Sequence, residues 1–223
     1  MLFIKTCMMK DIAIYGAGGL GREIATLVRR INAVEAKWNL IGFFDDGKEK
    51  GAQVSHFGPV LGDMEVLNSW DRPLDIAIAI GSPKTLKAIR GKITNGNVSF
   101  PNLISPGMKY ADIETFSLGE GNIIQGTCAA TTDVTIGNFN ILNGEIVLGH
   151  DVKIGDFNVF MPDIHVAGEV SIGEGNLFGV GSIVIQCLRV GNDVTLGPGA
   201  VLMTKPKNGC TYLGNPAKLF RFK

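Results

Sequence analysis

The sequence lacks any imbalance of charge and any long apolar run. Its 223 residues contain 21 lysines and arginines against 21 aspartates and glutamates, so no net field attracts a nucleic acid or an anionic membrane. No segment approaches the roughly 18 apolar residues that span a bilayer, and the apolar N-terminal segment is too short for a signal peptide. We therefore expect no nucleic-acid partner, no membrane association and a cytoplasmic location.

Residues that bind metals or form disulfides are also scarce. The four cysteines, Cys7, Cys128, Cys187 and Cys210, have neither the paired spacing of a zinc site nor the density of a secreted disulfide scaffold. Only three histidines are present, and they do not share a common spacing. We expect reduced cysteines and no bound metal.

Glycine, in contrast, is abundant, with 30 residues, and accompanies a six-residue repeat. Every sixth residue from Leu118 to Leu202 is apolar, without a single insertion. The residue after each apolar position is often glycine. The fourth residue after each apolar position is usually small, aliphatic or asparagine, which is typical of a parallel β-helix. An antiparallel sandwich is the alternative, but its strands vary in length and would not keep a gapless register.

A period of eighteen residues lies on top of the period of six. The aliphatic-glycine pair recurs at 118, 136, 154, 172 and 190, so three hexapeptides make one triangular coil. We expect the aliphatic side chains to fill the prism and glycine or asparagine to turn each corner through positive φ. Stacked coils would then satisfy one another's backbone groups.

Strands alternate with helices in the N-terminal part. The segment DIAIYGAGGLGREIATLVRRI has a short apolar strand, then Gly16, Gly18 and Gly21 in G-x-G-x-x-G order, then a helical pattern. This is the βα turn of dinucleotide-binding folds, in which helix N-terminal amides receive a phosphate. A glycine turn that serves only strand-to-helix packing is the alternative.

Two further strands end in residues suited to the same site. The strand LIGFFDD ends in Asp45 and Asp46, about where such folds place an acid on a ribose, and LDIAIAIG ends at Gly81. Because this region is only half of a full dinucleotide fold, we favour a mononucleotide or a nucleotide-sugar over NAD.

These patterns divide the chain into five segments. We expect an N-terminal extension at 1–10, a Rossmann-like nucleotide- or acceptor-binding domain at 11–100, a connection with a first partial coil at 101–117, the β-helix at 118–207 and a tail at 208–223. Leu103, Ile104 and Ile113 are the candidates for the partial coil.

His150 is the residue most suggestive of chemistry. It is the third residue of its hexapeptide, after Leu148 and Gly149, so it lies at or near a corner, where Asp151 can converge on it. A carboxylate held against imidazole fixes the tautomer and raises the basicity, as a general base requires. A plain surface histidine is the alternative.

The other two histidines are weaker candidates. His165 lies nearly one coil further along, where it would flank the same edge, and we interpret it as a surface or binding residue. We expect His56 to be a loop residue.

The order of motifs GAGGLGRE, FFDD, VLGD, AIAIG, FPNLISP, GHDVKIGD and LGNPAK resembles a known family from about residue 11 to the end. This family is the two-domain left-handed β-helix acetyltransferases of bacterial surface-glycan pathways. It includes enzymes that N-acetylate nucleotide-linked 4-amino-sugars and related sialic acid O-acetyltransferases. The resemblance implies an α/β Rossmann-like domain followed by a left-handed parallel β-helix, acetyl-CoA as donor, no metal, and a homotrimer with its active site at the subunit interface.

The resemblance also implies roles for individual residues. His150 would take a proton from the acceptor's amine or hydroxyl, Asp151 would orient it, and the amide of Gly168 would stabilise the oxyanion at the thioester oxygen. Acetyl-CoA would contact residues near Val180, Gly197 and Pro198, in a groove closed by the LGNPAK tail. The residues implied for the acceptor are Gly18, Gly19, Leu20, Asp45, Asp46 and Gly81.

Three positions depart from the family's pattern. Leu20 stands where many nucleotide-sugar members have histidine, which removes a polar contact to the acceptor. Val159 stands where some members have a histidine near the cofactor, with Asn158 beside it as a candidate replacement, and Ser105 stands where histidine is common. None of these departures removes the implied base.

Three functions compete on these grounds. The leading one is acetyl transfer to an amino group or hydroxyl of a sugar, preferably a nucleotide-linked one, with O-acetylation of a free sugar or another small hydroxyl acceptor as the alternative. An NAD-dependent dehydrogenase is disfavoured because a β-helix offers no second half for the nicotinamide. A non-catalytic scaffold is disfavoured by the intact GHD motif and Gly168.

Overall fold

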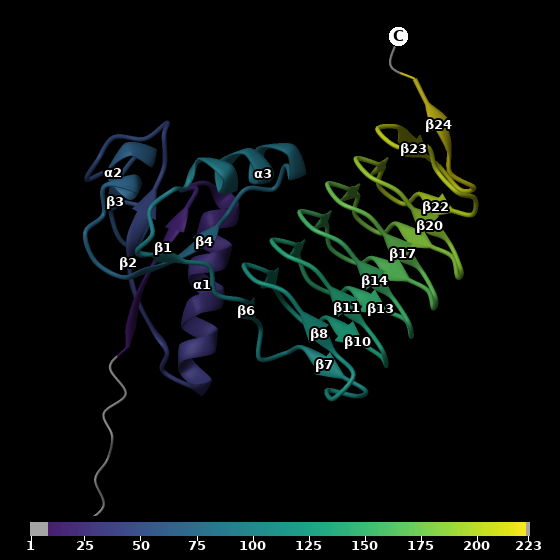
Figure 1. Ribbon diagram of the computed structural model, residues 1–223, viewed down its shortest axis with the longest axis horizontal. Helices are drawn as coiled ribbons and strands as arrows, with labels where there is room; N and C mark the ends of the chain where they lie inside the picture. Colours follow the sequence, from purple (N-terminus) through teal and green to yellow (C-terminus); the bar gives the residue numbers. More distant parts are fainter. Residues whose placement is uncertain (1–8, 222–223) are drawn as a thin grey trace, which may run out of the picture. The chain divides into compact units, whose positions relative to one another are not determined.

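The computed structural model describes residues 9–221, which form two compact units (Figure 1). One unit comprises the residues up to Ile80 together with Arg90–Pro101, and the other comprises Gly81–Ile89 and the chain from Asn102 onward. The predicted N-terminal extension at 1–10 lies outside the described residues except for Met9 and Lys10.

The first unit is a parallel sheet combined with helices, with strands in the order β3-β2-β1-β4-β5. Its elements are β1 (Lys10–Tyr15), α1 (Gly19–Val34), β2 (Trp38–Phe44), β3 (Val60–Gly62), α2 (Met64–Asn68), β4 (Leu74–Ile78), α3 (Pro83–Lys92, which begins in the second unit) and β5 (Val98–Ser99). The apolar side chains of β1 and β4, together with Phe43 and Phe44 of β2, are buried, as expected of strands covered on both faces. The predicted Rossmann-like fold is confirmed.

Two glycines of the first turn are required by close packing. Gly16 has φ +108°, and a Cβ on it would lie 2.7 Å from the carbonyl oxygen of Ala79, just after β4. A Cβ on Gly21 would collide with the carbonyl oxygen of Gly16. The glycine motif therefore fits helix α1 tightly over the sheet at these two positions.

The second unit is a three-sided parallel β-helix, seen on the right of Figure 1. Its first sheet contains β6 (Leu103–Ile104), β9 (Ile123–Ile124), β12 (Ile141–Leu142), β15 (Val159–Phe160), β18 (Leu177–Phe178), β21 (Thr195–Leu196), β23 (Thr211–Leu213) and, antiparallel at its end, β24 (Lys218–Phe220). The second sheet contains β7 (Lys109–Tyr110), β10 (Ala129–Ala130), β13 (Val147–Leu148), β16 (His165–Val166), β19 (Ile183–Val184) and β22 (Val201–Leu202). The third contains β8 (Ser117–Leu118), β11 (Thr135–Ile136), β14 (Lys153–Ile154), β17 (Ser171–Ile172) and β20 (Arg189–Val190).

The predicted register of the repeat is confirmed. Every strand from β8 to β22 ends on the predicted apolar position, and partners in neighbouring coils are eighteen residues apart. These side chains fill the prism, where Phe160 and Phe178 stack with ring centroids 4.6 Å apart. Leu103 and Ile104 form the expected start of the solenoid, whereas Ile113 is exposed and in no strand.

The expectation about the corners holds at only some of them. Positive φ falls on the third residue after most inward side chains, and this position is glycine at Gly121, Gly175, Gly181 and Gly199 but more often aspartate, glutamate or phenylalanine, as at Asp133, Glu145 and Phe157. The glycines that follow the inward residues are needed for another reason: a Cβ on Gly137 would lie 2.8 Å from the carbonyl oxygen of Gly155 in the next coil. Glycine at this position lets neighbouring coils approach closely.

The predicted asparagine positions lie inside the prism and form a ladder. Asn122, Asn140, Asn158 and Asn176 are fully buried, and each passes hydrogen bonds to the next coil. The Asn140 Oδ1 accepts from both the backbone N–H and the Nδ2 of Asn158, at 2.9 and 3.0 Å. Since an unpaired buried amide costs about 1–3 kcal/mol, the complete ladder holds the stack in one register.

Candidate active site

The predicted pair of His150 and Asp151 forms on the edge between the second and third sheets. The chain turns here through Asp151 at φ +59°, which brings the two successive side chains to the same side. His150 Nδ1 lies 2.9 Å from Asp151 Oδ2, and the two side chains are 58% and 57% exposed. Because an ionised carboxylate only accepts hydrogen bonds, Nδ1 is the nitrogen that donates to Asp151, which leaves Nε2 without a hydrogen-bond partner among the described residues.

Gly168 lies one coil above His150, and its lack of a side chain makes room for the imidazole. A Cβ on Gly168 would lie 2.7 Å from His150 Cε1 and closer still to Nε2. Within residues 9–221 the Gly168 N–H has no hydrogen-bond acceptor, although its carbonyl accepts from Cys187 N at 3.0 Å. A free backbone donor therefore lies beside a free ring nitrogen.

A small cavity adjoins this pair. It has a volume of about 300 Å³ and is lined by Asp151, Lys153, Glu169 and Ser171. The four positions belong to two successive coils, since Lys153 pairs with Ser171 in the sheet and Asp151 and Glu169 occupy the same corner position. Sequence reasoning missed Lys153, Glu169 and Ser171, although the eighteen-residue period places Glu169 directly above Asp151.

The predicted cofactor residues Val180, Gly197 and Pro198 occupy the edge between the first and second sheets. Within one chain they are therefore separated from His150 by the full width of the second sheet. Val180 and Pro198 are exposed, whereas Gly197 is covered by the side chain of Leu213. The structure does not bring this group to His150 within a single copy.

The LGNPAK tail packs on the last coil. The Val201 N–H donates to the Gly214 carbonyl at 3.0 Å, and the Ala217 N–H donates to the Val201 carbonyl at 2.8 Å. With Leu213 against Gly197, the tail lies next to the predicted cofactor residues.

The predicted acceptor residues of the first unit gather at the carboxyl ends of β1 and β2. Asp45 accepts from the Ala17 and Gly47 amides, at 2.8 and 2.9 Å, so it binds the glycine turn itself. Asp46 accepts from the Tyr15 hydroxyl at 2.7 Å and from the Met64 amide. Burial, with the Asp46 hydrogen bond second, raises the pKa of Tyr15 far above its usual range. Both carboxylates therefore also have structural roles.

Gly18 and Gly19 differ from the other two motif glycines because no atom of residues 9–221 requires glycine there. A Cβ at either position would meet no atom within 4 Å, and helix α1 has neither a side-chain cap nor an acidic residue in its first turn. Its N-terminal amides therefore face an open space, with the partly buried Leu20 next to it. A cavity of about 350 Å³ begins here, lined by Gly19, Arg22, Glu23, Thr26, Ser55 and Phe57.

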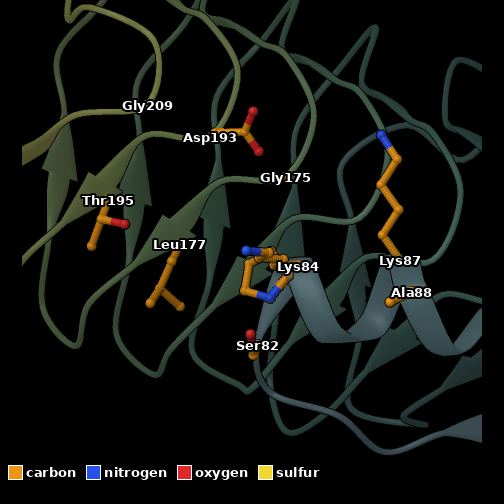
Figure 2. A pocket seen from close by; sticks show the side chains of 10 residues that line it. Ser82, Lys84, Lys87, Ala88, Gly175, Leu177, Asp193, Thr195 and Gly209 are labelled. Atoms are coloured by element: carbon orange, nitrogen blue, oxygen red, sulfur yellow. The ribbon is translucent and has the colours of Figure 1, made fainter.

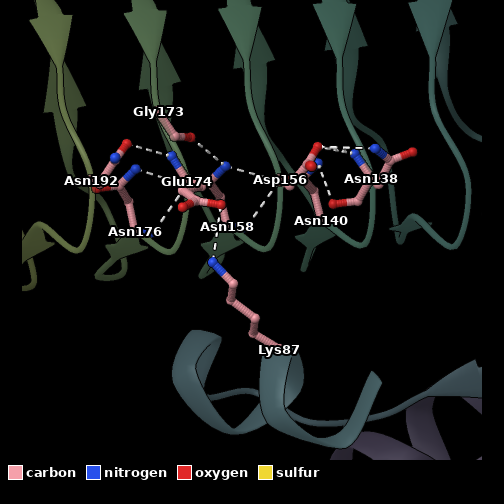
Figure 3. Close-up of polar contacts among 9 residues, drawn as sticks. All are labelled: Lys87, Asn138, Asn140, Asp156, Asn158, Gly173, Glu174, Asn176 and Asn192. Atoms are coloured by element: carbon pink, nitrogen blue, oxygen red, sulfur yellow. Dashed lines mark hydrogen bonds and ion pairs between the residues drawn. The ribbon is translucent and has the colours of Figure 1, made fainter. Parts of the chain in front are cut away.

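A larger cavity, of about 730 Å³, lies within the second unit beside the N-terminal half of α3 (Figure 2). Its lining includes Ser82, Lys84, Lys87, Leu177, Asp193 and Thr195. Lys87 binds Glu174 on the solenoid at 3.1 Å, as Figure 3 shows. Gly81, the last predicted acceptor residue, is exposed and directly precedes this lining. None of the residues that line this cavity belongs to the His150 pair.

The two other histidines, and the residues that stand where family members have histidine, are not part of the His150 pair. His165 is the first residue of β16, on the outer face of the second sheet and 3.4 Å from Asp163, and so does not share the edge with His150. His56 is in a loop, as expected. Asn158 is fully buried in the ladder and cannot replace a histidine at the cofactor, while Ser105 is buried and accepts from the Gly107 amide.

Residues 9–221 also bear on membrane spans and metal sites. No helix in this part of the chain has the length and apolar character to cross a membrane. The same residues contain no group of three or more histidine, cysteine or acidic side chains arranged to hold a metal ion.

Comparison with known proteins gives matches for both units. Residues 11–93 match the PglD N-terminal domain. The acetyltransferase domain of PglB from Neisseria gonorrhoeae, solved with acetyl coenzyme A, is 27% identical with a TM-score of 0.85, over 95% of this chain and 100% of that one. The chain has the two-domain architecture of sugar acetyltransferases. The predicted resemblance is thus confirmed.

Two further solved structures have the same extent of similarity. PerB from Caulobacter crescentus, in complex with CoA and GDP-perosamine, is 26% identical with a TM-score of 0.81, over 95% of this chain and 97% of that one. WeeI from Acinetobacter baumannii is 25% identical with a TM-score of 0.82, over 95% and 100%. No curated protein sequence matches the chain.

Proposed function

We propose that this chain transfers the acetyl group of acetyl-CoA to an amino group of a nucleotide-linked sugar, with His150 as the general base. The observation that carries the proposal is the convergence of a free imidazole nitrogen and an unused backbone amide, at His150 and Gly168, on one exposed edge. Relatives solved with acetyl coenzyme A, or with CoA and GDP-perosamine, support both substrates.

The chemistry follows from this geometry. The acceptor nitrogen attacks the thioester carbon while His150 Nε2 takes its proton, and Asp151 stabilises the imidazolium through Nδ1. Negative charge develops on the thioester oxygen, where the Gly168 N–H is available to donate. When the carbon–sulfur bond breaks, the imidazolium returns the proton to the sulfur of CoA, so no covalent enzyme intermediate is needed.

The acceptor's nucleotide would bind in the first unit. The sheet order places the switch point between β1 and β4, where ligands of open α/β sheets bind outside the carboxyl ends of the strands. Gly18, Gly19 and Leu20 open the uncapped helix α1 at this point, and free helix amides favour a phosphate. Asp45 and Asp46 lie beside the turn as acceptors for a ribose, and Gly81 follows β4.

The active site would be completed by a second copy in a homotrimer. The outer face of the second sheet carries the row Ala129, Val147, His165, Ile183 and Val201, of which Val147 and Ile183 are each 37% exposed. The edge with His150 and the edge with Val180 and Pro198 border this row on opposite sides. Packing of copies beside this face would bring one copy's cofactor residues to the other copy's base.

Turnover measured by release of the CoA thiol tests the function. The panel contains GDP-, UDP- and dTDP-linked 4-amino-sugars, the corresponding free sugars, and sialic acid as a hydroxyl acceptor. We expect CoA release with a nucleotide-linked amino-sugar, and loss of it in His150→Ala. Release only with a free sugar or a hydroxyl acceptor would favour the O-acetyltransferase alternative, and no release with any acceptor would refute the proposal.

Binding can be followed separately by thermal unfolding with acetyl-CoA, UDP and NADH, because a ligand of the native state raises its apparent stability. Stabilisation by acetyl-CoA and a nucleotide is expected. Stabilisation by NADH alone would support the dehydrogenase instead.

A further inference from the structure

The proposed function contains a proton imbalance that His150 alone does not resolve, and the following step rests on that function. An aliphatic amine is an ammonium ion near neutral pH, so it loses two protons on becoming an amide, whereas a hydroxyl loses one on becoming an ester. His150 has a single free ring nitrogen, Nε2, because Nδ1 is held by Asp151. The first proton of an ammonium acceptor must therefore go elsewhere, either directly to water or through a second group beside the base.

Glu169 is placed to be that group. It directly follows Gly168 and lies one coil above Asp151, at the same corner position, with φ +61° against +59°. Its N–H donates to the His150 carbonyl at 2.8 Å, which fixes the two residues in adjacent coils, roughly 4.8 Å apart. The imidazole lies against Gly168, so its Nε2 faces the segment that carries Glu169.

The cavity beside the pair has the charge that an ammonium ion requires. Its lining contributes the carboxylates of Asp151 and Glu169, one ammonium group at Lys153 and the hydroxyl of Ser171. Its formal charge is therefore negative. A volume of about 300 Å³ accommodates a single sugar ring rather than a whole nucleotide.

The charged and titratable groups around Glu169 come from both neighbouring coils. His150, Asp151 and Lys153 lie on the coil below. On the coil above, Cys187 occupies the same corner position, and Arg189 pairs with Ser171 in the third sheet. All of these side chains except that of Ser171 are exposed, so a proton released at Glu169 passes directly to water.

We propose that Glu169 holds the acceptor's ammonium group in this cavity and passes its first proton to water, so that Glu169 selects an amine over a hydroxyl. The neutral amine then attacks the thioester carbon as His150 takes the second proton. The carbon–sulfur bond breaks and the second proton goes to the CoA sulfur. The products are the amide, the CoA thiol and one proton in solution.

The test compares Glu169→Gln with the matched control Glu145→Gln. Glu145 is an exposed glutamate at the equivalent corner position of the edge between the first and second sheets, with φ +56°, and it does not line the cavity. The acceptors are the nucleotide-linked 4-amino-sugar that the wild type turns over and the same nucleotide-sugar with a hydroxyl in place of the amine. Full-length protein is used, and thermal unfolding checks that each variant folds.

With the amine at pH 7, E169Q should lower kcat/KM about tenfold, mainly through KM, because a charge-assisted hydrogen bond is lost. The loss should shrink to about twofold or less above the acceptor's own pKa, where the amine is neutral. Glu169→Asp, which keeps the carboxylate, should recover part of the activity, and E145Q should behave as wild type.

An equal loss for both acceptors, or at both pH values, would overturn the assignment of Glu169, as would unchanged kcat/KM for the amine. A wild-type enzyme that acetylates only the hydroxyl acceptor would overturn it while leaving acetyl transfer intact. Absence of transfer to every acceptor would refute the proposed function itself, and the role of Glu169 with it.

Discussion

Two edges of the prism have the same backbone conformation but leave different groups available. On the edge between the third and first sheets, asparagine or aspartate side chains of the next coil accept from the backbone amides of Glu120, Asn138, Glu174 and Asn192. On the edge between the second and third sheets, the equivalent amides of Thr132, His150, Gly168 and Gln186 have no side-chain acceptor among the described residues. One edge is closed by its own side chains, and the other is left open for a ligand.

The closed edge has one interruption, and it is instructive. Glu174 stands where an asparagine or aspartate would accept from the Asp156 amide, and its longer side chain instead binds Lys87 (Figure 3). A change of one methylene at this position thus redirects a carboxylate from the backbone to a helix. The difference between the edges therefore arises from the side chains, since the coil geometry is the same.

The largest expected effect is on the open edge. His150→Asn should lower kcat by about 10²–10⁴-fold, because it removes the proposed base while leaving a polar side chain of similar reach. Thr135→Asn, on the outer face of the third sheet, is the control and should retain nearly full activity in the same CoA-release assay. Equal losses in both variants would contradict the assignment of the base.

Gly168→Ala should lower kcat by about 10²-fold. The added Cβ would collide with the imidazole of His150 and move it away from the amide, so two interactions with the reacting atoms are disturbed together. Gln186→Ala, at the equivalent position one coil above, controls for any destabilisation of the β-helix caused by a substitution on this edge. Crystallographic or NMR observation of an undisplaced His150 in an inactive G168A would indicate that the amide alone matters.

Ile183→Asp should dissociate the oligomer and lower activity by about tenfold or more, because a charge would be buried between copies. Sedimentation velocity measures the state of assembly. Thr135→Asp, on the outer face of the third sheet, provides the control. A wild-type monomer with full activity would contradict the interface at the second sheet.

The smallest effects on activity and the clearest on stability are expected inside the prism. Asn140→Ala removes hydrogen bonds to both neighbouring coils and leaves buried partners unpaired, at a cost of about 3 kcal/mol. Asn138→Ala, on the closed edge, uncaps one amide that water can reach, at a cost of about 1 kcal/mol. Thermal unfolding should show a drop in Tm about three times larger for N140A; equal drops would contradict the importance of the buried ladder.

Much of the fold could be predicted because the repeat is a physical constraint on every coil. One inward side chain every sixth residue is the only register that fills the prism, so the strands from β8 to β22 followed from the apolar pattern alone. The corner conformation could not be predicted in the same way. Aspartate and phenylalanine tolerate positive φ there because interactions between stacked coils outweigh the local preference for glycine.

The site was predictable in part for a similar reason. His150 and Asp151 are adjacent in sequence, and a corner brings adjacent side chains together. Glu169 and Ser171 approach them only through the stacking of the next coil. The Gly168 amide is free because, within residues 9–221, no side chain of the next coil accepts a hydrogen bond from it. The pattern of residue types does not reveal this.

The gapless register makes a residue's number a coordinate of the prism. Residues 132, 150, 168 and 186 differ by eighteen and form one vertical column, so the number divided by eighteen gives height and the remainder gives direction. An insertion of one residue inside the array would rotate every later side chain by one position and turn aliphatic residues outward. The only extra residues before the regular array stand between Tyr110 and Leu118, which are eight apart rather than six. Changes of length in this fold must therefore come as whole coils or fall at such a corner, and the reactive edge can move only in steps of one coil.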